Sequence, residues 1–135
     1  MRISRVALAT LLSSTLLATP SFAHHAISSV FDTSKTVTLK GTITKVSWRV
    51  PHASLALDVR DATGKVTEWF IEMAGTGNLA KAGLDQSLID LTKTYSVEVY
   101  LAKDGKPQAV GITLIFPDSK SYDISEKPGP PAPAK

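Results

Sequence analysis

The stretch "VTLKGTITKVSW" (residues 37–48) decides the fold class of this chain. In its first half the apolar residues fall on odd-numbered positions, which is the period of two expected of a half-buried strand. Val46 and Trp48 continue the apolar face on even-numbered positions. One extra residue within Gly41–Lys45 would produce this shift. The stretch therefore predicts a long first strand that is bent by a β-bulge.

Four further strand patterns follow, and one stretch between the third and fourth strands is helical in character. Five strands with a helix in that place is the order of an OB-fold, a small and partly open Greek-key barrel. The sequence thus predicts an all-β, five-stranded OB-fold-like barrel with one short helix, and a plain antiparallel sandwich or open sheet is the alternative. The later strands are expected at residues 54–59, 66–74, 94–102 and 110–116, with turns at 61–65 and 103–106 and the helical stretch at 75–93.

The first 23 residues have the pattern of an export signal. Arg2 and Arg5 supply positive charge before an apolar run at residues 6–18, and Ser21 and Ala23 place small residues before a cleavage site. The run is shorter than the roughly 20 residues that a membrane-spanning helix needs. We expect cleavage after Ala23 and a periplasmic or secreted protein without stable membrane insertion. An uncleaved membrane anchor is the alternative.

The rest of the chain divides into three parts. Residues 24–34 form a polar lead that carries a histidine pair, and residues 35–118 contain the strand patterns of the barrel domain. Residues 119–135 end in "EKPGPPAPAK", whose proline content predicts a disordered tail.

Composition excludes several classes of function. The chain of 135 residues contains no cysteine, so it has no disulfide framework, thiolate metal site or cysteine nucleophile. Its net charge of +3 falls to +1 once Arg2 and Arg5 are removed with the signal. That charge is too small to predict binding to nucleic acid or to anionic lipid.

The three histidines, His24, His25 and His52, are the sharpest chemical signal. Cleavage after Ala23 would give His24 a free α-amine, which can chelate one ion together with its own Nδ1. An imidazole from His52, in the turn after the first strand, would complete the three-nitrogen arrangement called a histidine brace. Nitrogen-rich ligand sets without thiolate favour Cu(II) among the common divalent ions. The sequence therefore predicts copper as the bound ion.

Other arrangements of the same residues stay open. His25, as second residue, can bind through the amine, a deprotonated amide and its own imidazole. The histidine pair can also be an ordinary polar linker, with His52 hydrogen-bonded in its turn. Met73 is a possible soft contact for Cu(I), although its place in an apolar strand predicts a core residue.

Two other groups of side chains admit different functions. Glu68 and Glu72 lie four residues apart on one strand, as a pair for acid–base work on a glycoside would if a cleft held both. Aromatic side chains on a barrel can stack on bases or sugars, but core packing explains the tryptophans better. The aromatic residues concerned are Trp48, Trp69, Phe70 and Tyr100.

A family pattern runs through three segments. They are "AHHAISSVFD" (23–32), "VTLKGTITKVSWRVPHASLALDVRDATGKV" (37–66) and "VEVYLAKDGKPQAVG" (97–111). Together these segments resemble a family of small exported bacterial proteins of unknown function. The resemblance covers nearly all of the chain after the signal, and it implies a small β-barrel-like exported protein.

Two positions depart from that family's pattern. Val50 stands where the family has asparagine, and Ser54 stands where an aromatic residue is common. If the asparagine orients the histidine ring, that support is altered here. The resemblance makes the three histidines look like one unit. The matching positions are His24, His25, Phe31, Asp32, Gly41, Trp48, Pro51 and His52.

The sequence therefore favours an exported metal-binding protein that handles or delivers copper, with His24 and His52 as main ligands. His25 is the auxiliary ligand, and Asp32 is expected to orient a histidine. The partners expected are the ion itself and a periplasmic protein. The alternatives are a metal-free periplasmic binding module for a protein or small ligand, and a copper redox enzyme.

Overall fold

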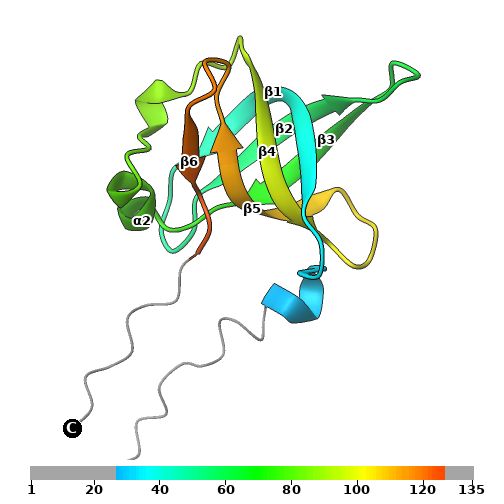
Figure 1. Cartoon of the computed structure of the whole chain (residues 1–135), viewed down its shortest axis with the longest axis horizontal. Coiled ribbons are helices and arrows are strands. Elements are labelled where there is room, and N and C mark those ends of the chain that lie inside the picture. Colours follow the sequence, from blue (N-terminus) through cyan, green and yellow to red (C-terminus); the bar gives the residue numbers. More distant parts are fainter. Residues whose placement is uncertain (1–26, 127–135) are drawn as a thin grey trace, which may run out of the picture.

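The computed structural model describes residues 27–126, which form a small β-barrel with short helices at its ends (Figure 1). The described part begins with helical residues 27–30. The elements that follow are β1 (Val37–Ser47), β2 (Ser54–Arg60), β3 (Val66–Glu72), α2 (Thr76–Lys81), the 3₁₀ turn η1 (Gln86–Leu88), β4 (Thr94–Leu101), β5 (Gln108–Ile115) and β6 (Ser121–Asp123).

Five strands close the barrel. β1 lies between β2 and β4, β3 follows β2, and β5 follows β4, all antiparallel. Parallel pairing of β3 with β5 joins the two edges, so the sheet is continuous round the barrel. This order confirms the predicted five-stranded, OB-fold-like Greek-key barrel with a helix between the third and fourth strands.

β1 serves both sides of the barrel by changing partners along its length. Its first half pairs with β4 and its second half with β2, and Thr42 belongs to both registers. The register with β2 slips between Ile43 and Lys45, which confirms the predicted bulge. A strand that must bend this sharply needs a residue without a side chain where the sheet folds over. Gly41 occupies that place.

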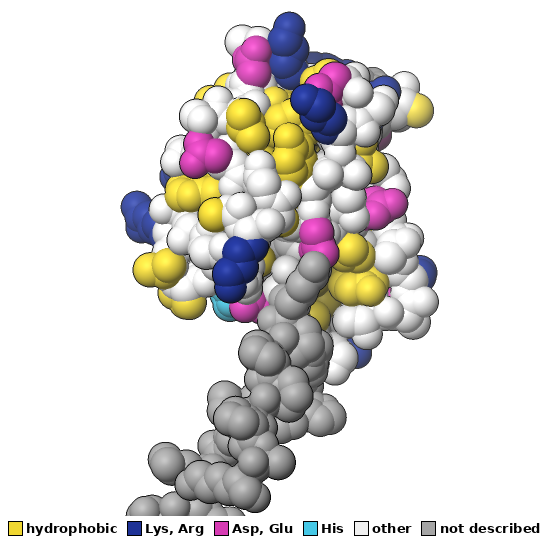
Figure 2. Space-filling model, turned by 60° about the vertical axis from the view of Figure 1, so that its left-hand side comes forward, with side chains coloured by type: hydrophobic (Ala, Val, Ile, Leu, Met, Phe, Trp, Pro, Cys, Tyr) yellow, Lys and Arg dark blue, Asp and Glu magenta, His cyan; other side chains and the backbone are white. Residues whose placement is uncertain are grey.

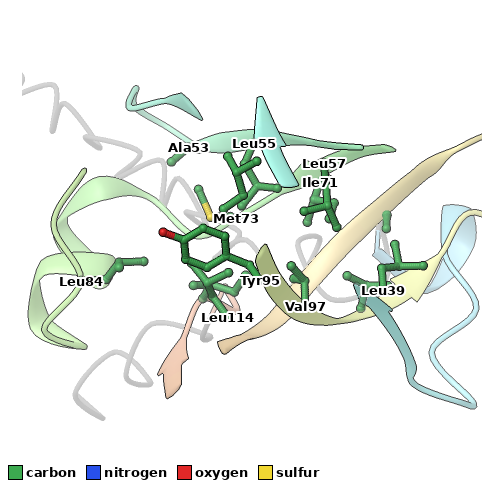
Figure 3. Packing of buried hydrophobic residues seen from close by; sticks show 14 of the residues in the cluster. Leu39, Ala53, Leu55, Leu57, Ile71, Met73, Leu84, Tyr95, Val97 and Leu114 are labelled. Atoms are coloured by element: carbon green, nitrogen blue, oxygen red, sulfur yellow. The ribbon is translucent and has the colours of Figure 1, made fainter. Parts of the chain in front are cut away.

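The core is a single apolar cluster inside the barrel (Figure 3). Met73 lies in it between Leu55 and Tyr95, and is 1% exposed. The Tyr95 hydroxyl bonds to the backbone of Asp90. Trp48 and Trp69 are partly buried and pack against the cluster, as the sequence predicted. The fully buried large side chains include Ile43, Leu55, Leu57, Ile71, Leu79, Leu84, Val97, Val99, Leu114 and Ile124.

β6 lies within residues 119–135, the segment for which the sequence predicted a disordered tail. It pairs with β5, and the following Ile124 is completely buried against the barrel. The described part of the barrel therefore extends past residue 118, the boundary expected from the sequence. Residues 127–135 lie outside the described part of the chain, as do residues 1–23 with the predicted signal.

Aspartates organise the turns between these strands. Asp32, Asp61, Asp85 and Asp90 each accept hydrogen bonds from the backbone N–H and the hydroxyl of the serine or threonine two residues later. Such bonds close a turn locally. They also favour the ionised form of the acceptor, so that the hydroxyl bond in each turn lowers the pKa of the aspartate.

The lowered pKa of the four turn aspartates predicts that the folded protein becomes less stable in acid. Because the pKa of the four aspartates is lower in the folded chain, the unfolded chain takes up protons first as the pH falls. The free energy of unfolding should be level above about pH 5 and decline below it, until the folded carboxylates are protonated too. Urea unfolding at a series of pH values measures the slope. Asp61→Asn should reduce the slope, and an identical slope would contradict the prediction.

Candidate functional site

The loop between β1 and β2 carries His52. Its neighbour Ala53 is fully buried, donates its N–H to the Ala74 carbonyl (3.2 Å) and accepts from the Met73 N–H (2.8 Å). These two bonds continue the β2–β3 pairing past the last paired residues of both strands. The His52 side chain is consequently carried beside Glu72, the final residue of β3.

One nitrogen of the His52 ring is occupied by Glu72. Nδ1 lies 2.7 Å from Glu72 Oε1. A lone pair on Nδ1 would repel the carboxylate oxygen at this distance. Nδ1 is therefore assigned the ring proton, and its N–H donates a hydrogen bond to Glu72 Oε1. A neutral ring then has its lone pair on Nε2, which is the nitrogen that a metal ion needs. A carboxylate behind the ring is the usual support of a metal-binding histidine.

Glu126 lies on the other side of the ring. Its Oε2 is 3.8 Å from His52 Nε2, and the same oxygen accepts the N–H of Gly75 at 3.2 Å. Ile124 holds this segment in place because its backbone bonds to both Ala74 (2.8 Å) and Ile112 (3.0 Å). The Glu126 carboxylate is thus fixed at two points of the barrel.

Gly75 brings the β3 end and the His52 loop into direct backbone contact. A Cβ at this position would lie 2.7 Å from the Pro51 carbonyl oxygen, closer than packed atoms tolerate. Glycine is required here by the close approach of two chains rather than by a turn. The contact holds the backbone of Pro51 next to Gly75, whose N–H donates to Glu126 Oε2. It therefore keeps the His52 loop close to the Glu126 carboxylate.

The N-terminal lead is fastened to the same end of the barrel. Phe31 forms an isolated β-bridge with Ala102, and the Lys103 N–H donates to the Val30 carbonyl at 2.9 Å. Phe31 also closes one helical turn by donating its N–H to the Ile27 carbonyl (2.8 Å). Ile27, the first described residue, therefore has a defined place.

A cavity of about 270 Å³ brings these parts together. Its apolar wall contains Ile27, Phe31, Met73 and Val110, and its polar wall contains His52, Glu72 and Glu126. The side chain of His52 is 41% exposed, so the cavity opens to solvent. Figure 2 shows the histidine of the described region at the molecular surface, next to an acidic side chain.

His24 and His25 lie outside the described residues. The chain nevertheless limits how far they can be from the cavity. His24 precedes Ile27 by three residues, which span at most about 11 Å when fully extended. Since Ile27 lines the cavity that contains His52, an N-terminus at His24 would lie within about 11 Å of a residue of the cavity wall.

Residues 27–126 contain no cluster of three or more histidine, cysteine, aspartate or glutamate side chains that could hold a metal. Of the three predicted ligands, His52 alone lies within this range, and Glu72 and Glu126 lie beside its ring without forming such a cluster. Asp32 is engaged with Ser34 and Lys35. At His52 the carboxylate beside the ring is that of Glu72, whereas an orienting role of Asp32 toward His24 or His25 stays a prediction.

Glu68 and Glu72 do not share a site. Four residues of strand separate them by about 13 Å, beyond the roughly 5–9.5 Å used by glycosidase carboxylates. Glu68 lines a different hollow of about 330 Å³, on the outer face of β1–β3 with Lys45 and Phe70. Glu72 belongs to the His52 cavity. The pair therefore does not form one acid–base centre.

Sequence reasoning missed the roles of Glu72 and Glu126. The proximity of Glu72 to His52 follows from the pairing of β2 with β3. Ser54 pairs with Glu72, and His52 precedes Ser54 by two residues. Strand residues two apart point to the same face. Glu126 carried no comparable signal, since it begins the proline-rich end "EKPGPPAPAK".

Comparisons with known proteins give a family and no function. A family model described as "Family of unknown function (DUF6152)" matches residues 11–112. No curated protein and no solved structure matches the chain. Within residues 27–126, no helix has the length and apolar character needed to cross a bilayer. The matched range includes the three histidines and Glu72, and it ends before Glu126.

Proposed function

The chain belongs to the DUF6152 family, a family of unknown function, and we propose that it is an exported protein that binds one copper ion. In this proposal the signal is cleaved after Ala23, and the mature protein works in the periplasm or outside the cell. His24 supplies its α-amine and Nδ1, and His52 supplies the opposing imidazole through Nε2. His25 is the auxiliary ligand.

The observation that carries the proposal is the contact of His52 with Glu72. A separation of 2.7 Å between Nδ1 and the carboxylate supports a proton on Nδ1, which leaves the lone pair of Nε2 free for an ion. Carboxylate–histidine pairs of this kind hold the ring and raise its basicity as a ligand.

The chemistry of the donors favours copper. Two histidines and an amine give a nitrogen-rich set, the chain has no cysteine, and Cu(II) stands highest in the affinity order of the common divalent ions. The open cavity, with His52 41% exposed, suits an ion that is taken up and passed on. We therefore propose handling or delivery of copper, with a periplasmic protein as the partner.

A metal-free binding module is the second candidate function. The observation that favours it is the apolar wall of the cavity, which contains Ile27, Phe31 and Val110. A small ligand or a peptide side chain could pack there, with His52 and the carboxylates as polar contacts. This function needs neither the free amine nor copper, and so the two candidates make opposite predictions about the N-terminus.

The decisive experiment varies the N-terminus alone. The exported protein is first checked by intact mass for a start at His24. Cu(II) is then titrated against this form and against a form that retains Ala23. The retained alanine moves the amine away from His24, so affinity should fall at least tenfold, on the order seen when a metal site loses its support.

A second form controls for the length of the lead. An alanine inserted between Ala26 and Ile27 lengthens the lead by the same one residue but leaves the amine on His24, and this form should bind Cu(II) as the exported form does. Equal affinity with and without Ala23 would contradict the proposal. Absence of Cu(II) binding in all forms would favour the metal-free module.

A further inference from the structure

We infer that Glu126 is a direct oxygen ligand of the ion at His52 and that it makes the site selective for Cu(II) over Cu(I). The inference rests on the proposed function and adds a ligand and a selectivity to it. Glu72 is by contrast a positioning residue, which acts on the ion only through the imidazole ring.

The distance between His52 Nε2 and Glu126 Oε2 is the first argument. At 3.8 Å it is too long for a hydrogen bond, which needs about 2.7–3.2 Å. With metal–ligand bonds of about 2.0–2.1 Å, two donors on one ion lie about 2.9 Å apart at a right angle and about 4.1 Å apart in line. The observed distance falls within that span.

The support of Glu126 is the second argument. Its Oε2 accepts the Gly75 N–H, and ligating carboxylates in metal sites commonly accept such a bond. Ile124, two residues earlier, is fully buried and bonded to Ala74. The carboxylate is therefore held near Nε2 by the fold, at a side chain that is one-third exposed.

The position of Glu72 excludes it from the same role. Its contact is with Nδ1, and the N–H of Nδ1 points away from the lone pair of Nε2. An ion bound to Nε2 therefore lies on the side of the ring opposite Glu72. The two carboxylates flank one imidazole and have different tasks.

The carboxylate oxygen of Glu126 would favour one oxidation state of a bound copper ion over the other. Carboxylate and imidazole suit Cu(II), whereas Cu(I) prefers thiolate and thioether sulfur. After removal of residues 1–23 the single sulfur atom of the chain is that of Met73, which is 1% exposed in the core. The site thus offers Cu(II) an oxygen ligand in Glu126 next to His52 Nε2, and offers Cu(I) a single thioether that is almost completely buried in the cavity wall.

The experiment compares two oxidation states in matched variants of the mature protein. Cu(II), and separately Cu(I) under anaerobic conditions, is titrated with a competing chelator against wild type, Glu126→Gln, Glu72→Gln and Glu68→Gln. Glutamine keeps an oxygen for the Gly75 N–H, so the fold should survive, and thermal unfolding checks this. Glu68 lies on the same strand as Glu72 and lines another hollow, which makes it the control.

Glu126→Gln should weaken Cu(II) about tenfold and leave Cu(I) unchanged, so that the potential of bound copper rises by about 59 mV. Electron paramagnetic resonance of the Cu(II) form should change as well. Glu72→Gln should weaken both oxidation states to a similar extent, and Glu68→Gln should weaken neither.

Two results would overturn the inference, and they differ. If wild type binds Cu(II) and Glu126→Gln binds it equally well with the same resonance spectrum, the ligand role fails while the proposed function stands. If wild type with His24 at its N-terminus binds no copper, the proposed function fails and the inference fails with it.

Discussion

Alanine at His52 is expected to lower the Cu(II) affinity of the mature protein at least about 100-fold. Loss of a supporting residue alone commonly costs 10–100-fold, and His52→Ala removes a ligand outright. The barrel should remain folded, because the His52 side chain is 41% exposed and its neighbour Ala53 keeps both backbone bonds to residues 73 and 74. Titration with a chelator and circular dichroism measure the two quantities.

His25→Ala is the matched comparison for this variant. If His24 and His52 form the brace, His25→Ala should weaken Cu(II) far less than His52→Ala does. The opposite order would show that the amine, the amide and His25 bind the ion, and would refute the place given to His52. Both variants of the mature protein keep the free amine on His24, so the comparison isolates the contribution of each imidazole.

The second large effect concerns the fold. Gly41→Ala is expected to reduce the free energy of unfolding by about 3 kcal/mol, the upper end of the usual range for overpacked sites. A Cβ at Gly41 would run into the carbonyl of Asp58, with the carbonyl carbon at 2.8 Å and Leu57 Cγ at 3.3 Å. Because the obstacle is backbone of β2, it cannot swing away as a side chain could.

Gly77→Ala is the control for this substitution. Gly77 lies in α2 with nothing within 4 Å of the added Cβ, and alanine favours a helix over glycine by about 1 kcal/mol. Chemical unfolding should thus show opposite signs for the two glycines. A Gly41→Ala protein as stable as wild type would mean that β1 does not bend against β2 as described.

The strands could be predicted from the sequence because each carries its own apolar alternation. The bulge in β1 was predictable for the same reason, since the shift from Ile43 to Val46 is visible in the printed sequence. Closure of the barrel followed from the order of elements and from no single residue. Local patterns thus determine most of this fold.

β6 could not be predicted because its stability is not local. Its three residues contain one apolar side chain, Tyr122. Its place depends on pairing with β5 and on Ile124, which enters the core. A strand this short is distinguished from a loop only by its partner in space.

The candidate site, like the fold, has a part that could be predicted from local sequence and a part that could not. His52 was predictable from its position after Pro51 in a likely binding loop. Its two carboxylate neighbours come from residues 20 and 74 positions away along the chain, Glu72 and Glu126. Strand registers brought Glu72 close, whereas Glu126 needed the unforeseen β6.

The bond from the Ala74 N–H to the Ile124 carbonyl ties the site to a unit of local unfolding. A short edge strand such as β6 can open while the closed barrel stays intact, at a smaller free energy than global unfolding. In that opened state Ile124 and Glu126 leave together, and the Ala74 amide becomes exchangeable. If an ion binds at His52 as proposed, we expect its lifetime on the protein to depend on local opening of β6, and only weakly on the stability of the five strands that enclose the core.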